Sequence, residues 1–148
     1  MALRDIVKDG QASLRKKSRE VTVFDAKLGK LLDDMRQTML AADGVGLAGP
    51  QVGINRRLAV VEVDDFYVEL VNPVIVATEG VQVGPEGCLS VPNRNCNVAR
   101  PYKVTVEYQD RYGNHMSLQA EELIARACCH EIDHLDGILF YDKEYKEQ

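Results

Sequence analysis

His130-Glu131-Ile132-Asp133-His134, near the end of a chain of 148 residues, places two histidines four positions apart. A helix turns by about 100° per residue, so these two side chains lie on one face, where both imidazoles can bind the same metal ion. Glu131 lies beside that pair, where its carboxylate can accept a proton from water without binding the metal. The motif therefore predicts a helix and hydrolysis by a metal-activated water.

A catalytic metal normally needs a third protein ligand, with the fourth position left for water. A longer form of the motif would supply a third histidine at the position where this chain has Phe140. Glu144 and Glu147 lie in what we expect to be a solvated tail, and His115 lies in a polar stretch before the helix. A cysteine is therefore the better candidate.

Four cysteines are available, and their surroundings in the sequence differ. The two on the expected helix, Cys128 and Cys129, point to other faces than the histidines, so we expect them to pack. Cys96 lies in a polar segment that we expect to be a loop. Cys88 follows Gly87 in a tight segment, where glycine permits unusual backbone angles beside the thiol. We therefore predict that Cys88 is the third ligand.

The pattern of apolar residues predicts two helices and several strands. Apolar residues recur at helical spacing from Leu28 to Met39, with Asp25 as the N-cap. Strands are expected at residues 58–63, 66–71, 103–109 and 116–119. The last helix stops near Gly137, and its buried side is expected to consist of Leu123, Ile124, Ala127 and Cys128. We expect an α+β fold, in which antiparallel sheets pack around a central metal-binding helix, with a further helix toward the N-terminus.

The length and charge of the chain limit the classes of protein to which it can belong. The length fits a single domain over residues 1–148, and a net charge of -5 argues against a general affinity for nucleic acid. Residues 1–9 lack the apolar core of a signal peptide, and no apolar run is long enough to span a bilayer. We therefore expect a cytoplasmic protein with no membrane partner and no direct sequence-specific binding of nucleic acid. In that compartment the four cysteines should be thiols or metal ligands.

The glycine-rich segment from Gly44 to Gly49 also matches the dinucleotide pattern G-x-G-x-x-G. That pattern requires a strand before it and a helix after it. Here an expected helix precedes the segment, and Pro50 follows it directly. A dinucleotide site is therefore excluded, which leaves either a turn that only ends the helix or a functional loop.

Three segments together resemble the peptide deformylases: residues 44–53 (GVGLAGPQVG), 86–90 (EGCLS) and 130–134 (HEIDH). They follow the order and spacing of that family, and the similarity extends over nearly the whole chain. Each motif meets a separate chemical need, so three in order are a strong signal. The resemblance implies a hydrolase that removes the N-formyl group from the N-terminal methionine of newly made polypeptides and releases formate.

The resemblance also implies how the metal is held. Cys88, His130 and His134 would bind one divalent ion, Fe²⁺ in the family, which Zn²⁺, Ni²⁺ or Co²⁺ can replace in purified protein. Glu131 would take a proton from the attacking water and pass it to the departing amine. Two other functions also fit the metal motif: a metallopeptidase or other metal amidase, and a silent homologue that only binds peptide or metal.

The remaining expected site residues bind the substrate or the charge that develops on it. The side-chain amide of Gln51 and the backbone N–H of Leu89 would stabilise the oxyanion, and an intact Gln51 favours an enzyme over a silent homologue. The peptide would add as a strand against Val45 and Gly46. The pocket for the methionine side chain would be formed by Leu123, Ala127 and the aliphatic stem of Arg126, whose charged end we expect in solvent.

The chain departs from the family at two places. The family usually has alanine at the position of Gly49, so Gly49→Ala should stabilise this protein and preserve or modestly raise formate release. Longer members carry a basic C-terminal helix that docks near the ribosomal exit tunnel, whereas this chain ends at residues 145–148 (YKEQ). Only a transient ribosome contact is expected. Glu86 and Arg100 are expected to form an ion pair that steadies the cysteine loop.

Overall fold

The fold combines two helices with two antiparallel sheets, as the α+β prediction expected. The computed structural model describes residues 2–146. Two long helices and three short 3-10 turns are present: α1 (Ala26–Ala41), α2 (Glu122–Leu135), η1 (Ala12–Arg15), η2 (Gly49–Val52) and η3 (Phe140–Lys143). The strands are β1 (Gly46–Ala48), β2 (Leu58–Val63), β3 (Phe66–Glu79), β4 (Gln82–Cys88), β5 (Val91–Arg100), β6 (Lys103–Gln109) and β7 (His115–Glu121).

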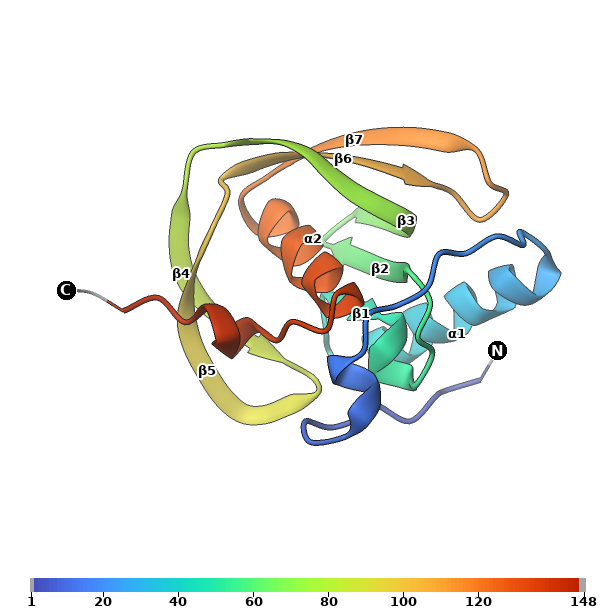
Figure 1. Cartoon of the computed structure of the whole chain (residues 1–148), viewed down its shortest axis with the longest axis horizontal. Helices are drawn as coiled ribbons and strands as arrows, with labels where there is room; N and C mark the ends of the chain where they lie inside the picture. Colours follow the sequence, from blue (N-terminus) through green and yellow to red (C-terminus); the bar gives the residue numbers. More distant parts are fainter. Residues whose placement is uncertain (1, 147–148) are drawn as a thin grey trace.

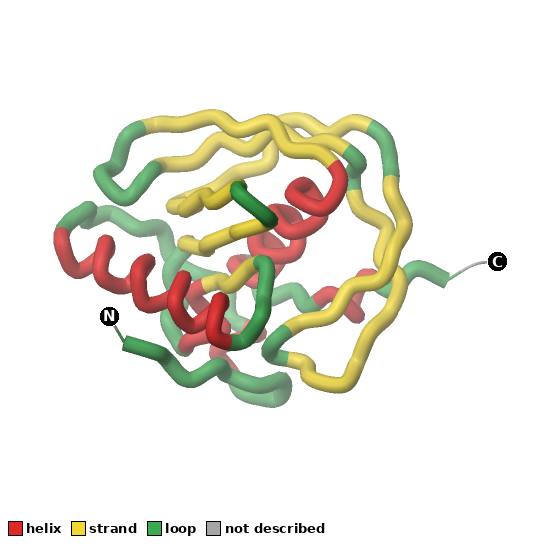
Figure 2. The backbone as a smooth tube through the Cα atoms, turned by 180° about the vertical axis from the view of Figure 1, so that it is seen from behind, coloured by secondary structure: helices red, strands yellow, loops and turns green. Residues whose placement is uncertain are grey.

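The two sheets curve around α2. Five strands form one sheet in the order β1-β2-β3-β6-β7, and β4 pairs with β5 in the second sheet. Figure 1 shows α2 enclosed by these sheets, with the β4–β5 hairpin on one side and α1 on the other. The view from behind shows the same arrangement (Figure 2). Neither helix is long and apolar enough, within the described residues, to cross a membrane.

Helix α1 forms as its sequence pattern predicted. The side chain of Asp25 accepts a hydrogen bond from the backbone N–H of Leu28, which satisfies one of the free donors at the helix start. Leu28, Leu32, Met35 and Met39 are buried and pack against β1 and β2. Helix α1 therefore fixes the position of the glycine-rich segment that follows it.

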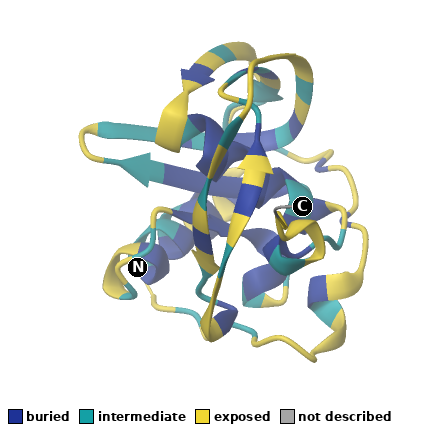
Figure 3. Ribbon diagram, turned by 90° about the vertical axis from the view of Figure 1, so that its left-hand side faces the viewer, coloured by how far each residue is buried: buried dark blue, intermediate teal, exposed yellow. Residues whose placement is uncertain are grey.

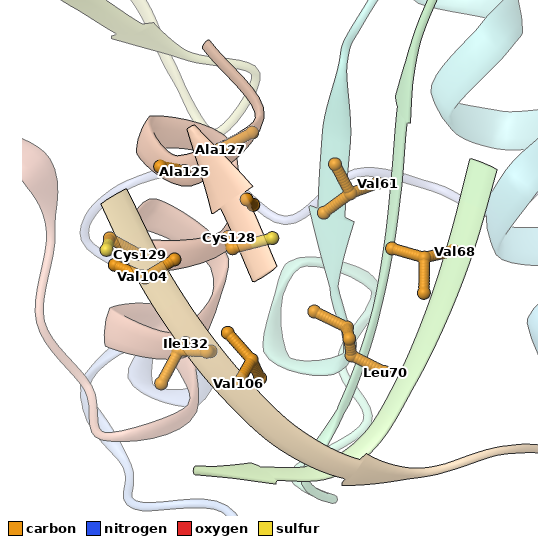
Figure 4. Close-up of a cluster of buried hydrophobic side chains, with 11 residues drawn as sticks. Val61, Val68, Leu70, Val104, Val106, Ala125, Ala127, Cys128, Cys129 and Ile132 are labelled. Carbon is orange, nitrogen blue, oxygen red and sulfur yellow. The ribbon is translucent and has the colours of Figure 1, made fainter. Parts of the chain in front are cut away.

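The core beside α2 is apolar and lies between that helix and the five-stranded sheet. Figure 4 shows Cys128 and Ile132 of α2 facing the strands that carry Val61, Leu70 and Val106. Burial raises the pKa of Cys128 to about 12 and that of Cys129 to about 11, so both remain thiols. As expected, these two cysteines pack in the core.

Two strand predictions were incomplete or wrong. Strand β3 continues beyond residue 71 to Glu79, with register shifts after Val71. Residues 93–97, expected to be a loop, belong to strand β5. Figure 3 shows exposed and buried residues mixed along the β4–β5 hairpin. Polar residues such as Asn93 and Asn97 occupy its exposed positions, which hides the strand in the sequence.

Candidate metal centre and active-site cleft

Cys88, His130 and His134 come together between β4 and α2. Their ligand atoms all lie within 4.8 Å of one another, and Cys88 Sγ is 3.4 Å from His134 Nε2. Both histidines are almost fully buried on the face of α2 that looks toward the β4–β5 hairpin. The three predicted metal ligands are therefore close enough to share one ion.

The β4–β5 hairpin brings Cys88 close to α2 because the pairing of its two strands is irregular at this residue. The register shifts between Glu86 and Cys88, and Cys88 pairs with Val91 across the tight connection. A side chain at Gly87 would approach Asn95 Oδ1 to 2.5 Å, so glycine is the residue that fits without displacing Asn95. The local backbone thus directs the thiol of Cys88 toward α2.

The carboxylate of Glu86 contacts the imidazole of one of the two histidines, His130. Its Oε1 lies 2.9 Å from His130 Nδ1, which leaves Nε2 of that imidazole free for a metal. Arg100 donates hydrogen bonds to both carboxylate oxygens, and Arg126 donates to Oε2 at 2.6 Å. Although burial opposes ionisation, the hydrogen bonds from Arg100 and His130 hold the pKa of Glu86 well below its ordinary value. Glu86 therefore remains a carboxylate.

These contacts extend one prediction and correct another. The expected ion pair between Glu86 and Arg100 is present, but the sequence did not indicate that Glu86 also contacts His130. Arg126 was expected to hold its charged end in solvent, yet the residue is only 8% exposed. Its guanidinium also donates to the backbone carbonyl of Val98 at 3.1 Å. The charged end of Arg126 is buried because its partner, Glu86, is buried, and Glu86 lies forty positions earlier in the chain.

Glu131 is buried beside the three predicted ligands and has no arginine or histidine hydrogen-bonded to it among residues 2–146. Its Oε1 makes no hydrogen bond within the described chain. Burial raises its pKa to about 7, an effect that the charge of His130 only partly opposes. Gly46 lies directly against this carboxylate, and any side chain at position 46 would collide with Glu131 Oε2. Glu131 therefore lines the cavity as a buried carboxyl group, one oxygen of which has no hydrogen-bond partner in the described chain.

The electrostatics of the cluster fit a bound cation. Burial opposes the charged form of His130, but Glu131, Cys88 and Glu86 raise its pKa to about 10. Burial and the neighbouring charge of His130 lower the pKa of His134 well below its ordinary value, so that histidine is neutral, as a ligand must be. In this cluster one positive charge is stabilised by the surrounding carboxylates, and a divalent ion would replace that proton. One sulfur and two nitrogen donors also suit Fe²⁺ or Zn²⁺.

Gln51 faces the same cleft from the η2 turn. It is almost fully buried, and its Oε1 accepts a hydrogen bond from the backbone N–H of Ala48 at 2.9 Å. Its Nε2 lies 3.5 Å from Cys88 Sγ and 3.2 Å from Ser90 Oγ. No role was predicted for Ser90; its place inside the EGCLS segment was the signal in the sequence that could have indicated one.

The surroundings of Gly49 contradict the prediction made for it. A methyl group at this position would lie 2.6 Å from the carbonyl oxygen of Ile54 and 2.9 Å from that of Arg56. Backbone atoms cannot move aside as the end of a flexible side chain can. Alanine is therefore expected to strain the turn that carries Gln51, and stabilisation by Gly49→Ala is no longer expected.

A cavity of about 360 Å³ opens in front of the cluster. Leu123, expected on the buried side of α2, is 49% exposed at its rim, because it lies in the first turn of the helix. Of the predicted site residues only His134 does not line the cavity; those that do are Val45, Gly46, Gln51, Cys88, Leu89, Leu123, Arg126, Ala127, His130 and Glu131.

Comparisons with known proteins give one consistent result. The family model described as polypeptide deformylase matches residues 3–148. A peptide deformylase of Caldicellulosiruptor bescii is 57% identical over 143 residues, covering 97% of this chain and 86% of that protein. The crystal structure of a Thermotoga maritima peptide deformylase superposes with a TM-score of 0.95 at 38% identity, covering 97% and 99% of the two chains. A Synechococcus elongatus peptide deformylase, solved in complex with actinonin, gives 0.93 at 40% identity, with 97% and 79% covered.

Proposed function

Because the chain belongs to the polypeptide deformylase family, we propose that Cys88, His130 and His134 bind the divalent ion on which that family depends. Membership gives the activity: this metal-dependent hydrolase removes the formyl group from N-formylmethionyl peptides and releases formate. The observation that carries the assignment of residues is the cluster of three donor atoms within 4.8 Å of one another. Beside it lies Glu131, whose Oε1 has no hydrogen-bond partner in the part of the chain that the structure describes. When bound there, the ion supplies Lewis acidity that lowers the pKa of a water and polarises the formyl oxygen.

Glu131 and Gln51 divide the remaining chemistry between them. Glu131 accepts a proton from the attacking water and passes it to the nitrogen of the departing amine. As the formyl carbon becomes tetrahedral, negative charge develops on its oxygen. The side-chain amide of Gln51 and the backbone N–H of Leu89 donate hydrogen bonds to that oxygen. Both residues line the cavity, which supports this arrangement.

The peptide is bound by its backbone and by its first side chain. Strand β1 is at the edge of the five-stranded sheet, so a substrate can pair with the backbone at Val45 and Gly46 and accept many sequences beyond the first residue. The methionine side chain enters the cavity against Leu123, Ala127 and the stem of Arg126. Hydrogen bonds to Glu86 and Val98 fix Arg126, so this wall of the pocket is rigid.

The physiological setting follows from the family rather than from any contact in the structure. We propose Fe²⁺ as the natural ion, with Zn²⁺, Ni²⁺ or Co²⁺ replacing it in purified protein, and action on nascent chains in the cytoplasm. A contact with the ribosome would be transient, and the net charge of -5 argues against sequence-specific binding of nucleic acid.

Anaerobic purification, metal analysis and a formate-release assay on a formyl-Met peptide test these assignments. The parent protein should hold one ion per chain and cleave only at the formyl group. Cys88→Ser should lose metal and activity, whereas Cys96→Ser, Cys128→Ser and Cys129→Ser should keep about one ion per chain. Dependence of metal retention on Cys128 or Cys129 would show that the ligand set is wrong. Cleavage of internal peptide bonds would favour a metallopeptidase.

A further inference from the structure

We propose that Ser90 is a positioning residue, which acts on the reaction by orienting the side-chain amide of Gln51. The proposal rests on the role given above to Gln51 as a donor to the oxyanion. Ser90 is fully buried, and its Oγ lies 3.2 Å from Gln51 Nε2. It lies behind the amide and does not line the cavity itself.

Of the two N–H groups of the Gln51 amide, only the one with the weaker partner can turn to the substrate. The backbone N–H of Ala48 donates to Oε1, which fixes the oxygen and nitrogen ends of the amide. A primary amide nitrogen carries two N–H groups. One donates to Ser90 Oγ at 3.2 Å, and the other donates to Cys88 Sγ at 3.5 Å. Sulfur is a weak acceptor, so an oxyanion in the cleft can replace it as the partner of that second N–H. The bond to Ser90 therefore sets the direction of the donor that faces the reacting formyl group.

The backbones of the two residues are held together independently of this bond. The N–H of Val7 donates to the carbonyl of Gln51 at 2.7 Å, and the N–H of Asp9 donates to the carbonyl of Ser90 at 2.8 Å. One N-terminal segment, residues 7–9, thus fastens both loops. Removing the hydroxyl of Ser90 should leave the loops in place and release only the rotation of the amide.

The expected effect is a fall in turnover without a change in substrate affinity. A donor aimed at the oxyanion acts mainly in the transition state, so its loss lowers kcat and leaves KM nearly unchanged. One hydrogen bond between neutral groups contributes about 1 kcal/mol, so we expect Ser90→Ala to lower kcat by about 5- to 10-fold. A role confined to filling space would instead lower stability and leave kcat of the folded enzyme unchanged.

A double-mutant cycle on the metal-loaded enzyme tests the proposal. Gln51→Met keeps the volume of the side chain but removes its donors, and should lower kcat by about 10²- to 10³-fold. Adding Ser90→Ala to Gln51→Met should produce no further fall. The matched control is Ser18→Ala, which removes another buried hydroxyl, one without a hydrogen-bond partner in the described chain, and should leave kcat unchanged.

Side-chain NMR of metal-free protein gives a readout that does not depend on activity. The ¹⁵N-labelled amide of Gln51 should show two separate proton signals, and Ser90→Ala should shift the signal of the proton that donates to Ser90 Oγ. Additive effects on kcat, a change confined to KM, or an unaltered amide spectrum would overturn the proposal. If Gln51→Met keeps full turnover, the assigned role of Gln51 fails too; if only Ser90→Ala is silent, the failure is that of Ser90 alone.

Discussion

Glu86 and Glu131 are two buried carboxylates that both act on His130, and their surroundings differ completely. Glu86 belongs to strand β4 and receives hydrogen bonds from two arginines and the imidazole of His130. Glu131 belongs to α2 and faces Gly46 of strand β1, and no group of the described chain forms a hydrogen bond with its Oε1. The pKa of Glu86 is lowered, and that of Glu131 is raised to about 7. Glu86 keeps its charge and orients the imidazole of His130, whereas Glu131 can gain and lose a proton near neutral pH.

The difference shows that partners, rather than burial, decide what a buried carboxylate can do. Burial raises the pKa of both groups, but only Glu86 has arginines close enough to overcome it. The β4–β5 side of the cleft is therefore built to hold a fixed charge. Within the described residues, Glu131 on the β1 side has no such counter-charge, as its proposed role of proton acceptor requires.

The largest effect is expected from Glu131→Gln, which should abolish the contrast by making Glu131 unable to accept a proton. A general base typically contributes about 10²- to 10⁴-fold, so formate release should fall by that factor. Glutamine keeps the shape of the side chain, so metal content should remain at one ion per chain. Measured turnover near that of the parent, with metal content confirmed, would remove Glu131 from its role.

Glu86→Gln should act on stability rather than on proton transfer. It leaves Arg126 without its buried counter-charge and Arg100 with only Asp133, so we expect a loss of about 3 kcal/mol in the free energy of unfolding. Urea denaturation measures this loss, and metal affinity should fall together with it. The acid limb of the pH profile of residual kcat should move to lower pH, because the negative charge of Glu86 contributes to the raised pKa of Glu131. An unchanged profile would mean that Glu86 does not act on the charge of Glu131.

The raised pKa of Glu131 also predicts how the stability of the metal-free protein depends on pH. A carboxyl group that binds its proton more tightly in the folded state contributes stability below its ordinary pKa of 4.5, and this is lost as pH rises through about 7. The loss should amount to about 3 kcal/mol. Metal-free Glu131→Gln should therefore be more stable than the parent at pH 8, with little difference at pH 4. Equal stability at pH 8 would contradict the unpaired environment of Glu131.

The smallest effect is expected from Gly49→Ala, which tests the β1 side of the cleft. The added methyl group would meet two backbone carbonyls, and we expect a loss of about 1 to 3 kcal/mol in the free energy of unfolding, with lower formate release. Gly29→Ala is the matched control, because it meets only the end of the Arg111 side chain and lies inside α1. The control should be neutral or stabilising. Stabilisation by Gly49→Ala would restore the prediction made from sequence.

The sequence predicted features that depend on local spacing and on the chemistry of single side chains. The span and N-cap of α1 followed from the apolar repeat and Asp25, and the shared face of His130 and His134 followed from their spacing. Features that depend on partners distant in the chain were not predictable. The buried guanidinium of Arg126 is an example, since its partner Glu86 is fixed only when β4 packs beside α2.

Strand β5 and the surroundings of Gly49 are two further features that could not be predicted from the sequence. The polar residues of β5 alternate poorly, because one face of a two-stranded hairpin is exposed, so the pattern resembled a loop. The unfavourable surroundings of Gly49 depend on how closely the carbonyls at residues 54 and 56 approach it. That approach is a property of the folded turn, and no residue type in the sequence indicates it.

The N-terminal segment forms hydrogen bonds to both loops, so two of its backbone amides are sensitive to changes in the cleft. The amide hydrogens of Val7 and Asp9 are held by the carbonyls of Gln51 and Ser90, although neither residue lines the cavity. These hydrogens can exchange with deuterium from solvent only when a loop releases them. A ligand that tightens the loops should therefore slow both exchange rates. Occupancy of the cleft could be followed at two positions outside the cavity, in the unmodified protein and without any added label on the site.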